Sequence, residues 1–335
     1  MSDLKPVLAK LATGATLDAD EAEAAFGIVM AGEATPAQIA GMLMAMRVRR
    51  ETVPELTGAV RAMLSRMVRV AAPEGAIDVC GTGGDGAGTL NVSTAVTFVL
   101  AGSGVVVAKH GNRALSSRTG GADVLTALGV NVDVPLDRLS GILRETGCVF
   151  MFAPRHHAAL RHAAGPRVEL ATRTIFNLVG PLANPARVQR QLTGVFAPNW
   201  AAPMAEALRD LGTEKAWVVH GQGLDELTVA GPNHVVSLDG GVITTFSVDA
   251  SDAGLPSAPV DAIRGGGSAE NAAALTALLD GALGPYRDTV VLNAAAGLIV
   301  AGQATSLRVA ARRAETAIDR GEARAMLDAL RRATA

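Results

Sequence analysis

One stretch of the sequence, residues 77–128, constrains the fold more than any other part of the chain. A short apolar run at 76–80 is typical of a buried strand, and four glycines follow within six positions, at 81, 83, 84 and 86. Asn91 is a candidate N-cap for a helix predicted at 93–101, and a second apolar run at 105–108 predicts another strand. The order strand, glycine loop, helix, strand predicts an α/β unit with parallel strands.

Residues 1–70 are predicted to be all-helical, because apolar residues recur there at three- and four-residue spacing. After a linker at 71–75, strands and helices alternate. This favours a mostly parallel central sheet flanked by helices, beside a smaller all-helical domain. The individual elements expected are helices at 18–31, 36–48, 53–70, 169–178 and 200–211, strands at 148–152 and 215–220, a hairpin within 227–248, and helices from 269 onward that include 293–301, 306–318 and 321–332.

The glycine loop and its surroundings indicate a site for a phosphorylated ligand. Glycine adopts positive φ and lets main-chain N–H groups approach an anion without a Cβ in the way. A helix that begins after such a loop directs its free N–H groups and the positive end of its dipole to the same place. Ser93 and Thr94 add hydroxyl groups there, and Ser93 is also a candidate ligand for a hard cation. Lys109 lies at the end of the next strand, near the same carboxyl edge of the sheet.

The segment 81–86 also matches the GxGxxG pattern of dinucleotide-binding folds, which by itself is a weak signal. Such folds place an acidic residue about twenty positions further on for the ribose hydroxyl groups. Here that zone carries Lys109 and His110, and no Gly-Lys-Ser or Gly-Lys-Thr follows as in a Walker motif. Phosphate or diphosphate binding is therefore favoured over nicotinamide binding and over a purely structural turn.

Two later segments carry further candidate residues. Arginines and histidines are dense between 155 and 173, but their spacing offers no pair of zinc ligands with an acidic base. Arginine there suits a carboxylate, which its planar fork binds in bidentate fashion. Asp225 and Glu226 follow a predicted strand, and two acids facing a diphosphate need a cation between them, for which magnesium is suited. The residues of the basic segment expected at the surface are Arg155, His156, Arg161 and His162.

The chain resembles the anthranilate phosphoribosyltransferase family over nearly its whole length, in the ordered segments GTGGDG, NVST, KHGNR, FAPRHHAAL, RTIFNLVGPLANPA and VVHGQGLDELT. The resemblance implies a nucleoside phosphorylase/phosphoribosyltransferase-like fold. It implies transfer of the phosphoribosyl group of 5-phosphoribosyl 1-diphosphate to the amine of anthranilate, with release of diphosphate, in tryptophan biosynthesis. It also implies Mg²⁺, as two ions per subunit, and a homodimer built through the helical domain.

The resemblance assigns site residues by matched position. For 5-phosphoribosyl 1-diphosphate they are Gly81, Gly84, Asp85, Thr89, Asn91, Ser93 and Thr94. Further substrate-binding residues are Val92, Lys109, His110, Gly111, Asn112, Arg113, Ser116, Ser117 and Gly121, of which Asn112 can hold either an amine or a carboxylate. For anthranilate they are Arg167, His157, Gly180 and Pro181, and for magnesium they are Ser93, Asp225 and Glu226. The expected catalytic residues are Lys109, which neutralises the departing diphosphate, and Asn112 and Arg167, which orient the amine. His110 is expected to supply a hydrogen bond, and Gly121, where the family often has serine or threonine, only a main-chain contact.

The length of 335 residues favours two domains. We expect a small helical domain at 1–70, completed by about 166–190 as the resemblance implies, and a large α/β domain at 71–165 and 191–335 that carries the diphosphate and metal sites. Six methionines between 30 and 67 suit either a helical core or a dimer face, and both interpretations stay open.

Composition argues against several other classes of protein. The net charge of −2 argues against nucleic acid as an obligatory partner. Cys80 and Cys148 are too few for a disulfide framework and are expected to be buried free thiols of a cytoplasmic protein. The most apolar run, 95–108, is interrupted at 102–104 and falls short of the roughly 20 residues that a membrane-spanning helix needs, so no membrane partner is expected.

Two rival functions compete with this assignment. A pyrimidine nucleoside phosphorylase-like enzyme would carry a different glycine loop and an additional C-terminal domain. A non-enzymatic, nucleic-acid-binding relative would lose the acid pair or the NVST segment and gain positive charge. The GTGGDG and KHGN segments argue against the first rival. The presence of Asn91, Ser93, Lys109, Asp225 and Glu226, with a slightly negative net charge, argues against the second.

Overall fold

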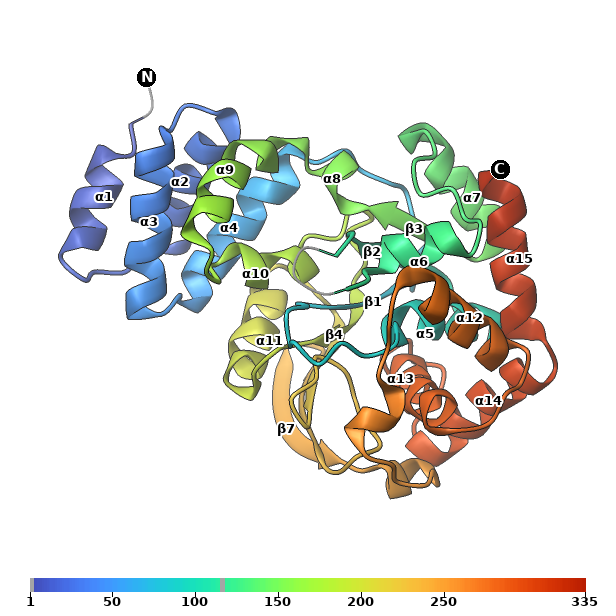
Figure 1. Cartoon of the computed structure of the whole chain (residues 1–335). Coiled ribbons are helices and arrows are strands. Elements are labelled where there is room, and N and C mark those ends of the chain that lie inside the picture. Colours follow the sequence, from blue (N-terminus) through green and yellow to red (C-terminus); the bar gives the residue numbers. More distant parts are fainter. Residues whose placement is uncertain (1–2, 115–117) are drawn as a thin grey trace.

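A seven-stranded sheet forms the centre of the molecule (Figure 1) in the computed structural model, which describes residues 3–114 and 118–335. The strand order is β3-β2-β1-β4-β5-β6-β7, with β1 to β5 parallel and β6 and β7 antiparallel to their neighbours. The strands are β1 (Ile77–Gly81), β2 (Val107–Gly111), β3 (Cys148–Phe152), β4 (Arg190–Gly194), β5 (Lys215–Gly221), β6 (Asn233–Asp239) and β7 (Val242–Val248). The predicted mostly parallel sheet is confirmed, and β6 with β7 forms the predicted hairpin.

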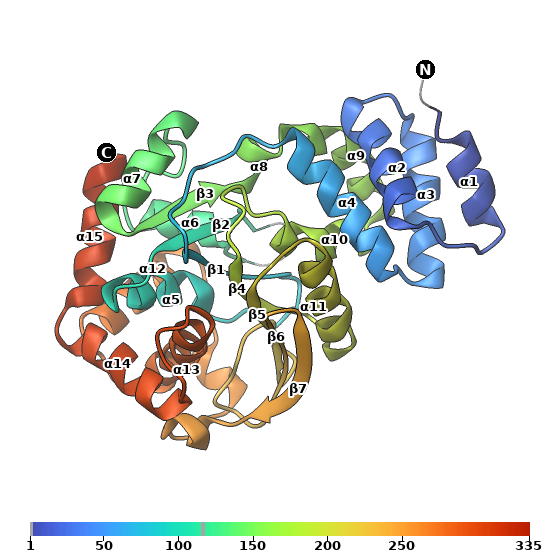
Figure 2. The same ribbon diagram turned by 180° about the vertical axis from the view of Figure 1, so that it is seen from behind.

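One face of the sheet is covered by helices from the middle and the end of the chain, with α5 and α13 packed directly on the strands (Figure 2). Their buried side chains form one hydrophobic cluster with the strands, in which Phe98 and Leu292 are fully buried. The helices of this layer are α5 (Val92–Gly102), α6 (Gly121–Ala127), α7 (Leu139–Thr146), α12 (Ser268–Leu279), α13 (Pro285–Val300), α14 (Leu307–Asp319) and α15 (Glu322–Thr334).

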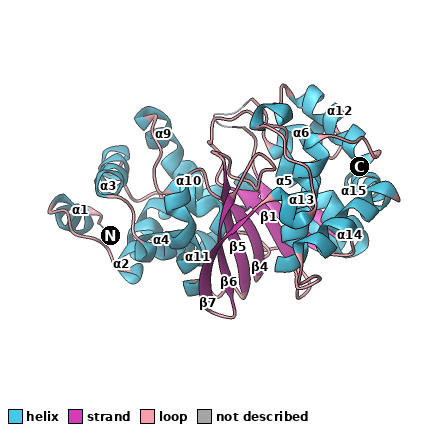
Figure 3. Ribbon diagram, turned by 90° about the horizontal axis from the view of Figure 1, so that it is seen from below, coloured by secondary structure: helices cyan, strands magenta, loops and turns pink. Residues whose placement is uncertain are grey.

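The opposite face is covered by α11 (Ala201–Asp210) and, beyond it, by a helical unit (Figure 3). The helices of this unit are α1 (Lys5–Ala12), α2 (Ala19–Ala31), α3 (Pro36–Arg49), α4 (Val53–Arg66), α9 (Arg161–Leu170) and α10 (Phe176–Val179). Side chains from 4–63 and from 163–183 share one hydrophobic cluster, which continues through α11 to Val218 on β5. We propose on this basis that residues near 166–190 complete the helical domain begun by residues 1–70.

Helices α2 and α3 start within one residue of their predicted positions, because their caps are local, whereas α1 was not predicted as a separate helix. Asp18 accepts a hydrogen bond from the main-chain N–H of Glu21, and the Glu21 carboxylate accepts one from the N–H of Asp18. The predicted helix 53–70 ends earlier, at Arg66. The N–H of Val68 donates to the carbonyl of His156 and that of Val70 to Pro185, so tertiary partners replace the helical ones.

The helix predicted at 169–178 is wrong. α9 ends at Leu170, Ala171 takes the left-handed conformation with φ of 48°, and α10 begins only at Phe176. Arg173, in the interruption, donates to the carbonyl of Gly84 in the glycine loop, and its guanidinium lies 4.0 Å from the centre of the Phe196 ring. The break therefore serves a contact between distant segments that a local pattern does not encode.

Short helical turns connect the larger elements. A single α-turn, α8 (Ala153–His156), follows β3, and 3₁₀ turns lie at Leu136–Arg138, Ala158–Leu160, Gly180–Leu182, Pro198–Trp200, Ala250–Ala253 and Val260–Ile263. Within residues 3–114 and 118–335, no helix combines the length and the apolar composition that crossing a membrane requires.

Candidate active site

A cleft opens at the carboxyl ends of the parallel strands, around β1. This strand has β2 on one side and β4 on the other, so the direction of strand succession reverses there, which is where open α/β sheets bind ligands. Two adjoining cavities of about 190 Å³ and about 330 Å³ form the cleft. The residues lining both are Gly81, Gly83, Gly84, Asn91, Ser93 and Gly120.

The smaller cavity joins the glycine loop to the acid pair. Gly83 and Gly84 both have positive φ, 66° and 74°. The Gly83 N–H donates to Oδ2 of Asp225 at 2.6 Å, and the N–H of Ser93, in the first turn of α5, donates to Oε1 of Glu226 at 3.2 Å. Main-chain donors of an anion site are thus occupied by the two carboxylates.

The acid loop lies directly against the strands. A Cβ atom at Gly194, at the end of β4, would overlap the main-chain carbonyl of Asp225, and one at Gly81 would overlap its carboxylate. Both positions therefore require glycine for close approach of two backbones. Gly194 was missed by the sequence interpretation, because a glycine at a strand end carries no sign of what packs on it.

Burial and mutual repulsion favour protonation of the acid pair. Burial is the main cause that raises the pKa of Asp225, and the nearby carboxylate of Asp85 raises it further. Burial likewise raises the pKa of Glu226, with the charge of Asp225 adding to it and that of Lys109 opposing it. Three oxygen-bearing acids around one small cavity fit a hard divalent cation, whose charge would stabilise their ionised forms.

Lys109 lines the larger cavity and bonds to Ser93, which lines both cavities. It lies within β2, is 4% exposed, and its Nζ donates to the carbonyl of Val79 and, at 3.2 Å, to Oγ of Ser93. Among the described residues Lys109 has no carboxylate within ion-pair distance. A buried ammonium group without a fixed counter-ion, beside an anion-binding loop, is suited to a negatively charged ligand.

The larger cavity is more apolar and is bounded partly by the helical unit, through Met63, Leu160 and Phe176. Arg167 on α9 also lines this cavity, and its guanidinium lies 5.1 Å from the centre of the Phe176 ring. Burial lowers the pKa of Arg167, and no carboxylate in the described part of the chain pairs with it. Such a guanidinium offers its fork to a carboxylate from outside.

Two adjacent histidines after β3 behave differently from one another. The ring of His157 lines the larger cavity, donates from Nε2 to the carbonyl of Ala183 at 2.8 Å, and has no partner for Nδ1 among the described residues. Burial lowers its pKa to about 4, so the ring is neutral near pH 7 and Nδ1 is a free acceptor. His156 was expected at the surface, and this is wrong, because its side chain is 1% exposed. Its Nδ1 donates to the carbonyl of Val68, and this bond connects α8 to the chain after α4.

The structure gathers the predicted site residues into this cleft. The members of the smaller cavity are Gly81, Gly84, Asp85, Thr89, Asn91, Val92, Ser93, Asp225 and Glu226. Those of the larger cavity are Thr94, Lys109, His110, Gly111, Asn112, Arg113, Gly121, His157, Arg167, Gly180 and Pro181. Ser116 and Ser117 lie outside the described residues.

Three of these side chains are engaged in ways that the sequence did not indicate. Asn91 occupies the N-cap position of α5, but its side chain makes no capping bond, and instead bonds to Asn271 at 2.8 Å. Arg113 lines the larger cavity, and its guanidinium donates to Asp123 at 3.2 Å. Both ring nitrogens of His110 are bonded within the protein.

Asn271, on α12, is a site residue that sequence reasoning missed. Its side chain accepts the N–H of Gly266 at 2.8 Å and donates to Asn91, and all three residues line the smaller cavity. The sequence offered no signal for it, because Asn271 lies in a segment recognised only as helical. Arg173 was also missed, because it reaches the glycine loop only through the break after α9, which the local sequence pattern does not show.

Known proteins resemble this chain over its whole length. Residues 73–324 match the model of a glycosyl transferase family α/β domain, and residues 5–67 match that family's helical bundle domain. The anthranilate phosphoribosyltransferase of Rhodopseudomonas palustris (strain HaA2) is 56% identical over 331 residues, 98% of each chain, and that of Sinorhizobium medicae (strain WSM419) is 55% identical over 330 residues, again 98% of each.

Solved structures agree with these relatives. The crystal structure of the anthranilate phosphoribosyltransferase from Thermus thermophilus has 43% identity and a TM-score of 0.93, covering 98% of each chain. The enzyme of Saccharomyces cerevisiae in complex with PRPP and Mg has 25% identity and a TM-score of 0.91, covering 99% of this chain and 97% of that one. The chain belongs to the anthranilate phosphoribosyltransferase family.

Proposed function

We propose that this protein transfers the phosphoribosyl group of 5-phosphoribosyl 1-diphosphate to the amine of anthranilate, releasing diphosphate, as a step of tryptophan biosynthesis. The observation that carries the proposal is the joined cleft. One cavity presents a glycine loop, a helix start and an acid group, and the adjoining one presents an unpaired arginine among apolar side chains. A diphosphate sugar and an aromatic carboxylate are the two chemistries that these cavities complement.

The diphosphate end of the donor fits the smaller cavity. Main-chain N–H groups at Gly83 and Ser93 are available once the carboxylates that now occupy them turn toward a cation. We propose that Ser93, Asp225 and Glu226 hold Mg²⁺, as two ions per subunit. Bound magnesium would supply charge neutralisation to the diphosphate, and the yeast relative, whose solved complex contains PRPP and Mg, supports this choice of ion.

The acceptor fits the larger cavity. Arg167 would hold the carboxylate of anthranilate, and Phe176 and Met63 provide apolar surface for its ring. The free Nδ1 of neutral His157 would accept a hydrogen bond from the amine, and the Asn112 side chain would orient the amine toward the sugar. The yeast enzyme in complex with 4-fluoroanthranilate supports an aromatic amino acid as the ligand.

The reaction would depend on charge stabilisation and positioning. Displacement at the anomeric carbon develops positive charge on the sugar and negative charge on the departing diphosphate. Lys109 is placed to stabilise the second of these, being buried beside Ser93 and the acid pair. The chemistry requires no covalent nucleophile, since an arylamine is itself the nucleophile and loses its proton readily after attack.

Anthranilate fluorescence tests the proposed function directly. We expect the fluorescence to decay when the protein is mixed with 5-phosphoribosyl 1-diphosphate and Mg²⁺, and the decay to stop when a chelator is added. Persistent fluorescence together with tight oligonucleotide binding would instead support a nucleic-acid-binding relative. Phosphate-dependent release of the free base from a pyrimidine nucleoside, without decay of anthranilate fluorescence, would support a nucleoside phosphorylase.

Arg167→Ala is expected to raise the KM for anthranilate by about 10- to 100-fold, the worth of a hydrogen-bonded charge pair. The KM for 5-phosphoribosyl 1-diphosphate should change less than twofold, because Arg167 lies in the acceptor cavity only. Arg161→Ala, an exposed arginine on the same helix, is the matched control. Steady-state kinetics with each substrate varied in turn measure both constants, and an equal rise in the two would remove Arg167 from the acceptor site.

We also propose a homodimer formed through the helical unit, in the cytoplasm. Val48 on α3 and Val168 on α9 are 80% and 79% exposed, and the two helices pack on each other, which supports an apolar contact surface there. Sedimentation equilibrium should give a dimer for the wild type and for Val309→Asp, which changes an exposed valine on α14, but a monomer for Val48→Asp combined with Val168→Asp.

The two cysteines are buried free thiols, as expected of a protein in a reducing compartment.

A further inference from the structure

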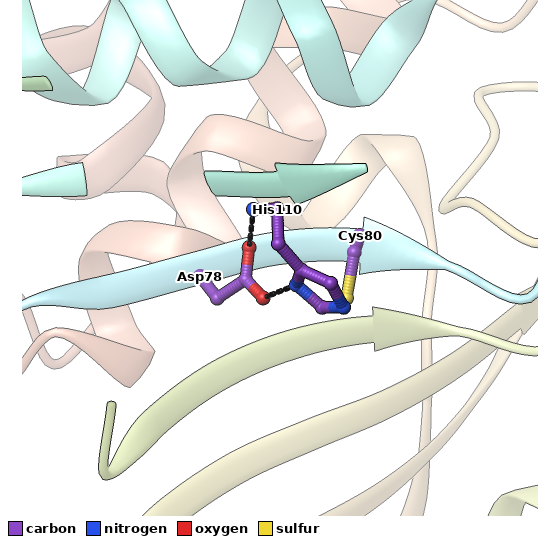
Figure 4. A group of neighbouring side chains, drawn as sticks. All are labelled: Asp78, Cys80 and His110. Atoms are coloured by element: carbon purple, nitrogen blue, oxygen red, sulfur yellow. Dashed lines mark hydrogen bonds and ion pairs between the residues drawn. The ribbon is translucent and has the colours of Figure 1, made fainter. Parts of the chain in front are cut away.

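A buried group of three ionisable side chains, Asp78 and Cys80 on β1 and His110 on β2 (Figure 4), lies at the acceptor cavity, which Cys80 and His110 line and Asp78 does not. Asp78 accepts two hydrogen bonds from His110, one from its main-chain N–H at 3.2 Å and one from Nδ1 of its ring. The other ring nitrogen, Nε2, lies 2.8 Å from the carbonyl oxygen of Gly180. His110 thus bridges the sheet and the segment 180–184, which returns from the helical unit.

The group is unsuited to a metal ion, although its ligand atoms lie within 4.8 Å of one another. Asp78 and His110 are in direct hydrogen-bond contact, which leaves no room for an ion between them. Burial raises the pKa of Cys80 well above its ordinary value, so the sulfur is a thiol, and it already accepts the Nε2–H of Gln191 at 3.4 Å. Direct hydrogen bonding, without a metal, accounts for the arrangement.

The ring of His110 faces an acceptor on each side. Nδ1 meets a carboxylate and Nε2 meets a carbonyl, so both contacts are favourable only when both nitrogens carry a proton. A neutral ring would keep the charge-assisted bond to Asp78 and turn the lone pair of Nε2 against the Gly180 oxygen. The contact to Gly180 therefore exists only in the doubly protonated ring.

We propose that the Asp78–His110 pair is a positioning device that holds the Gly180–Pro181 wall of the acceptor cavity in place. This inference rests on the proposed function only in treating that cavity as the anthranilate site. The pair acts through Gly180, whose main chain lines the cavity, and the ring of His110 need not touch the substrate. His110 is therefore a positioning residue, because both of its ring nitrogens are already hydrogen-bonded to the protein.

The wall has few other attachments to the sheet. Gln191 and the thiol of Cys80 donate to the carbonyl of Pro181, His157 donates to that of Ala183, and Asn184 donates to Asp78 at 2.7 Å and to Ala108 at 2.9 Å. Burial raises the pKa of Cys80 well above its ordinary value, so its thiol keeps the proton. These donors keep their protons at every pH near neutrality, whereas Nε2 of His110 does not. His110 is therefore the one attachment among the described residues here that titration can release.

The surroundings of His110 decide the direction of that titration. Burial by itself opposes a charged ring, but the charge of Asp78 and its hydrogen bond outweigh this and raise the pKa of His110 above its ordinary value. The other ionisable groups near it are Lys109 on β2, Cys80 on β1, and the neutral His156 and His157 after β3. Since the pKa is raised, the Gly180 contact is retained to higher pH than an ordinary histidine would allow, and it is lost as the pH rises through the pKa of His110.

Three variants test the proposal in the complete protein. His110→Asn keeps a donor toward Asp78 but is too short to reach Gly180, and should raise the KM for anthranilate at least tenfold while the KM for 5-phosphoribosyl 1-diphosphate stays within twofold. His110→Gln places an amide donor near Gly180 and should restore the KM for anthranilate to within about threefold of wild type. His234→Gln, a histidine of β6 outside the cleft, should match the wild type in both constants.

The pH profile separates positioning from general structural damage. In the wild type the KM for anthranilate should rise as the pH increases through the pKa of His110, and in His110→Gln this rise should be absent, since an amide does not titrate. Asp78→Asn removes the charge that sustains the imidazolium and should shift the rise to lower pH. A rise that persists unchanged in His110→Gln would overturn the proposal.

Amide hydrogen exchange supplies a readout that does not depend on the enzymatic reaction. The N–H of Ala183 donates to the carbonyl of Gly180, the same oxygen that His110 contacts. A peptide covering 176–184 should exchange at least fivefold faster in His110→Asn than in the wild type, and at the wild-type rate in His110→Gln. Equal exchange in all three refutes the positioning role, whereas absence of wild-type turnover with the expected exchange pattern refutes only the proposed function.

Discussion

Asp225→Asn combined with Glu226→Gln is expected to lower kcat/KM by about 10²- to 10³-fold and to remove the saturable dependence of the rate on Mg²⁺. These carboxylates accept the N–H groups of Gly83 and Ser93, which are also suitable donors for a diphosphate. Acid and ligand would compete for the same donors unless a cation draws the carboxylates away. The amide variants keep the shape of the acids and lose the charge that recruits the cation.

The measurement is the initial rate as a function of Mg²⁺ concentration at saturating substrates. Asp239→Asn, an acid at the far end of β6 whose partner is Lys215, is the matched control and should leave the titration unchanged. Thermal unfolding of the metal-free double variant should be no lower than that of the wild type, because the pKa values of both acids are raised by burial and repulsion in the folded state. A metal titration identical to wild type would exclude this pair as ligands.

Lys109→Met is expected to reduce kcat by about 10²- to 10³-fold, the scale of losing one preorganised charge at a developing anion. Methionine retains most of the length and apolar volume of the lysine stem, so the core around β2 remains filled. The variant leaves the carbonyl of Val79 without its donor, which costs about 1–3 kcal/mol of stability. The loss of rate should therefore exceed what any loss of folded protein explains.

Single-turnover rates, compared with the folded fraction from circular dichroism, separate these two effects for Lys109→Met. Lys215→Met serves as the control, since Lys215 is the first residue of β5, which is separated from β2 by β1 and β4, and it pairs with an exposed acid. A folded Lys109→Met protein with a rate within fivefold of wild type would show that diphosphate departs without help from this ammonium group.

Local patterns predicted those parts of the fold whose cause is local. The five residues of β3 were predicted to the residue, because a short apolar run between turn signals is fully buried in a parallel sheet. Helices α2 and α3 began where Asp18 and Thr35 provide capping boxes within the sequence itself. The last three helices were predicted within a few residues, apart from α13, which starts at Pro285 rather than near 293.

Predictions failed where a distant segment supplies the hydrogen-bond partner. The helix expected to reach residue 70 stops at Arg66, because the next N–H groups bond to the chain near His156 and Pro185. The helix expected at 169–178 is broken so that Arg173 can reach the glycine loop. In each case the competing partner lies more than 80 positions away in the sequence.

The sequence by itself determined the chemistry that this protein can offer. The glycine loop, the lysine after the second strand, the arginine at 167 and the acid pair at 225–226 are residue types in an order that already favours a diphosphate sugar and a carboxylate. Only the tertiary structure decided how these groups are held. It set the carboxylate of Asp225 on the amide of Gly83 and that of Glu226 on the amide of Ser93, Asn271 beside Asn91, and His110 between Asp78 and Gly180. The physical reason is that a side chain's type is local, whereas its burial, its charge state and its hydrogen-bond partners depend on segments that meet only when the sheet has formed.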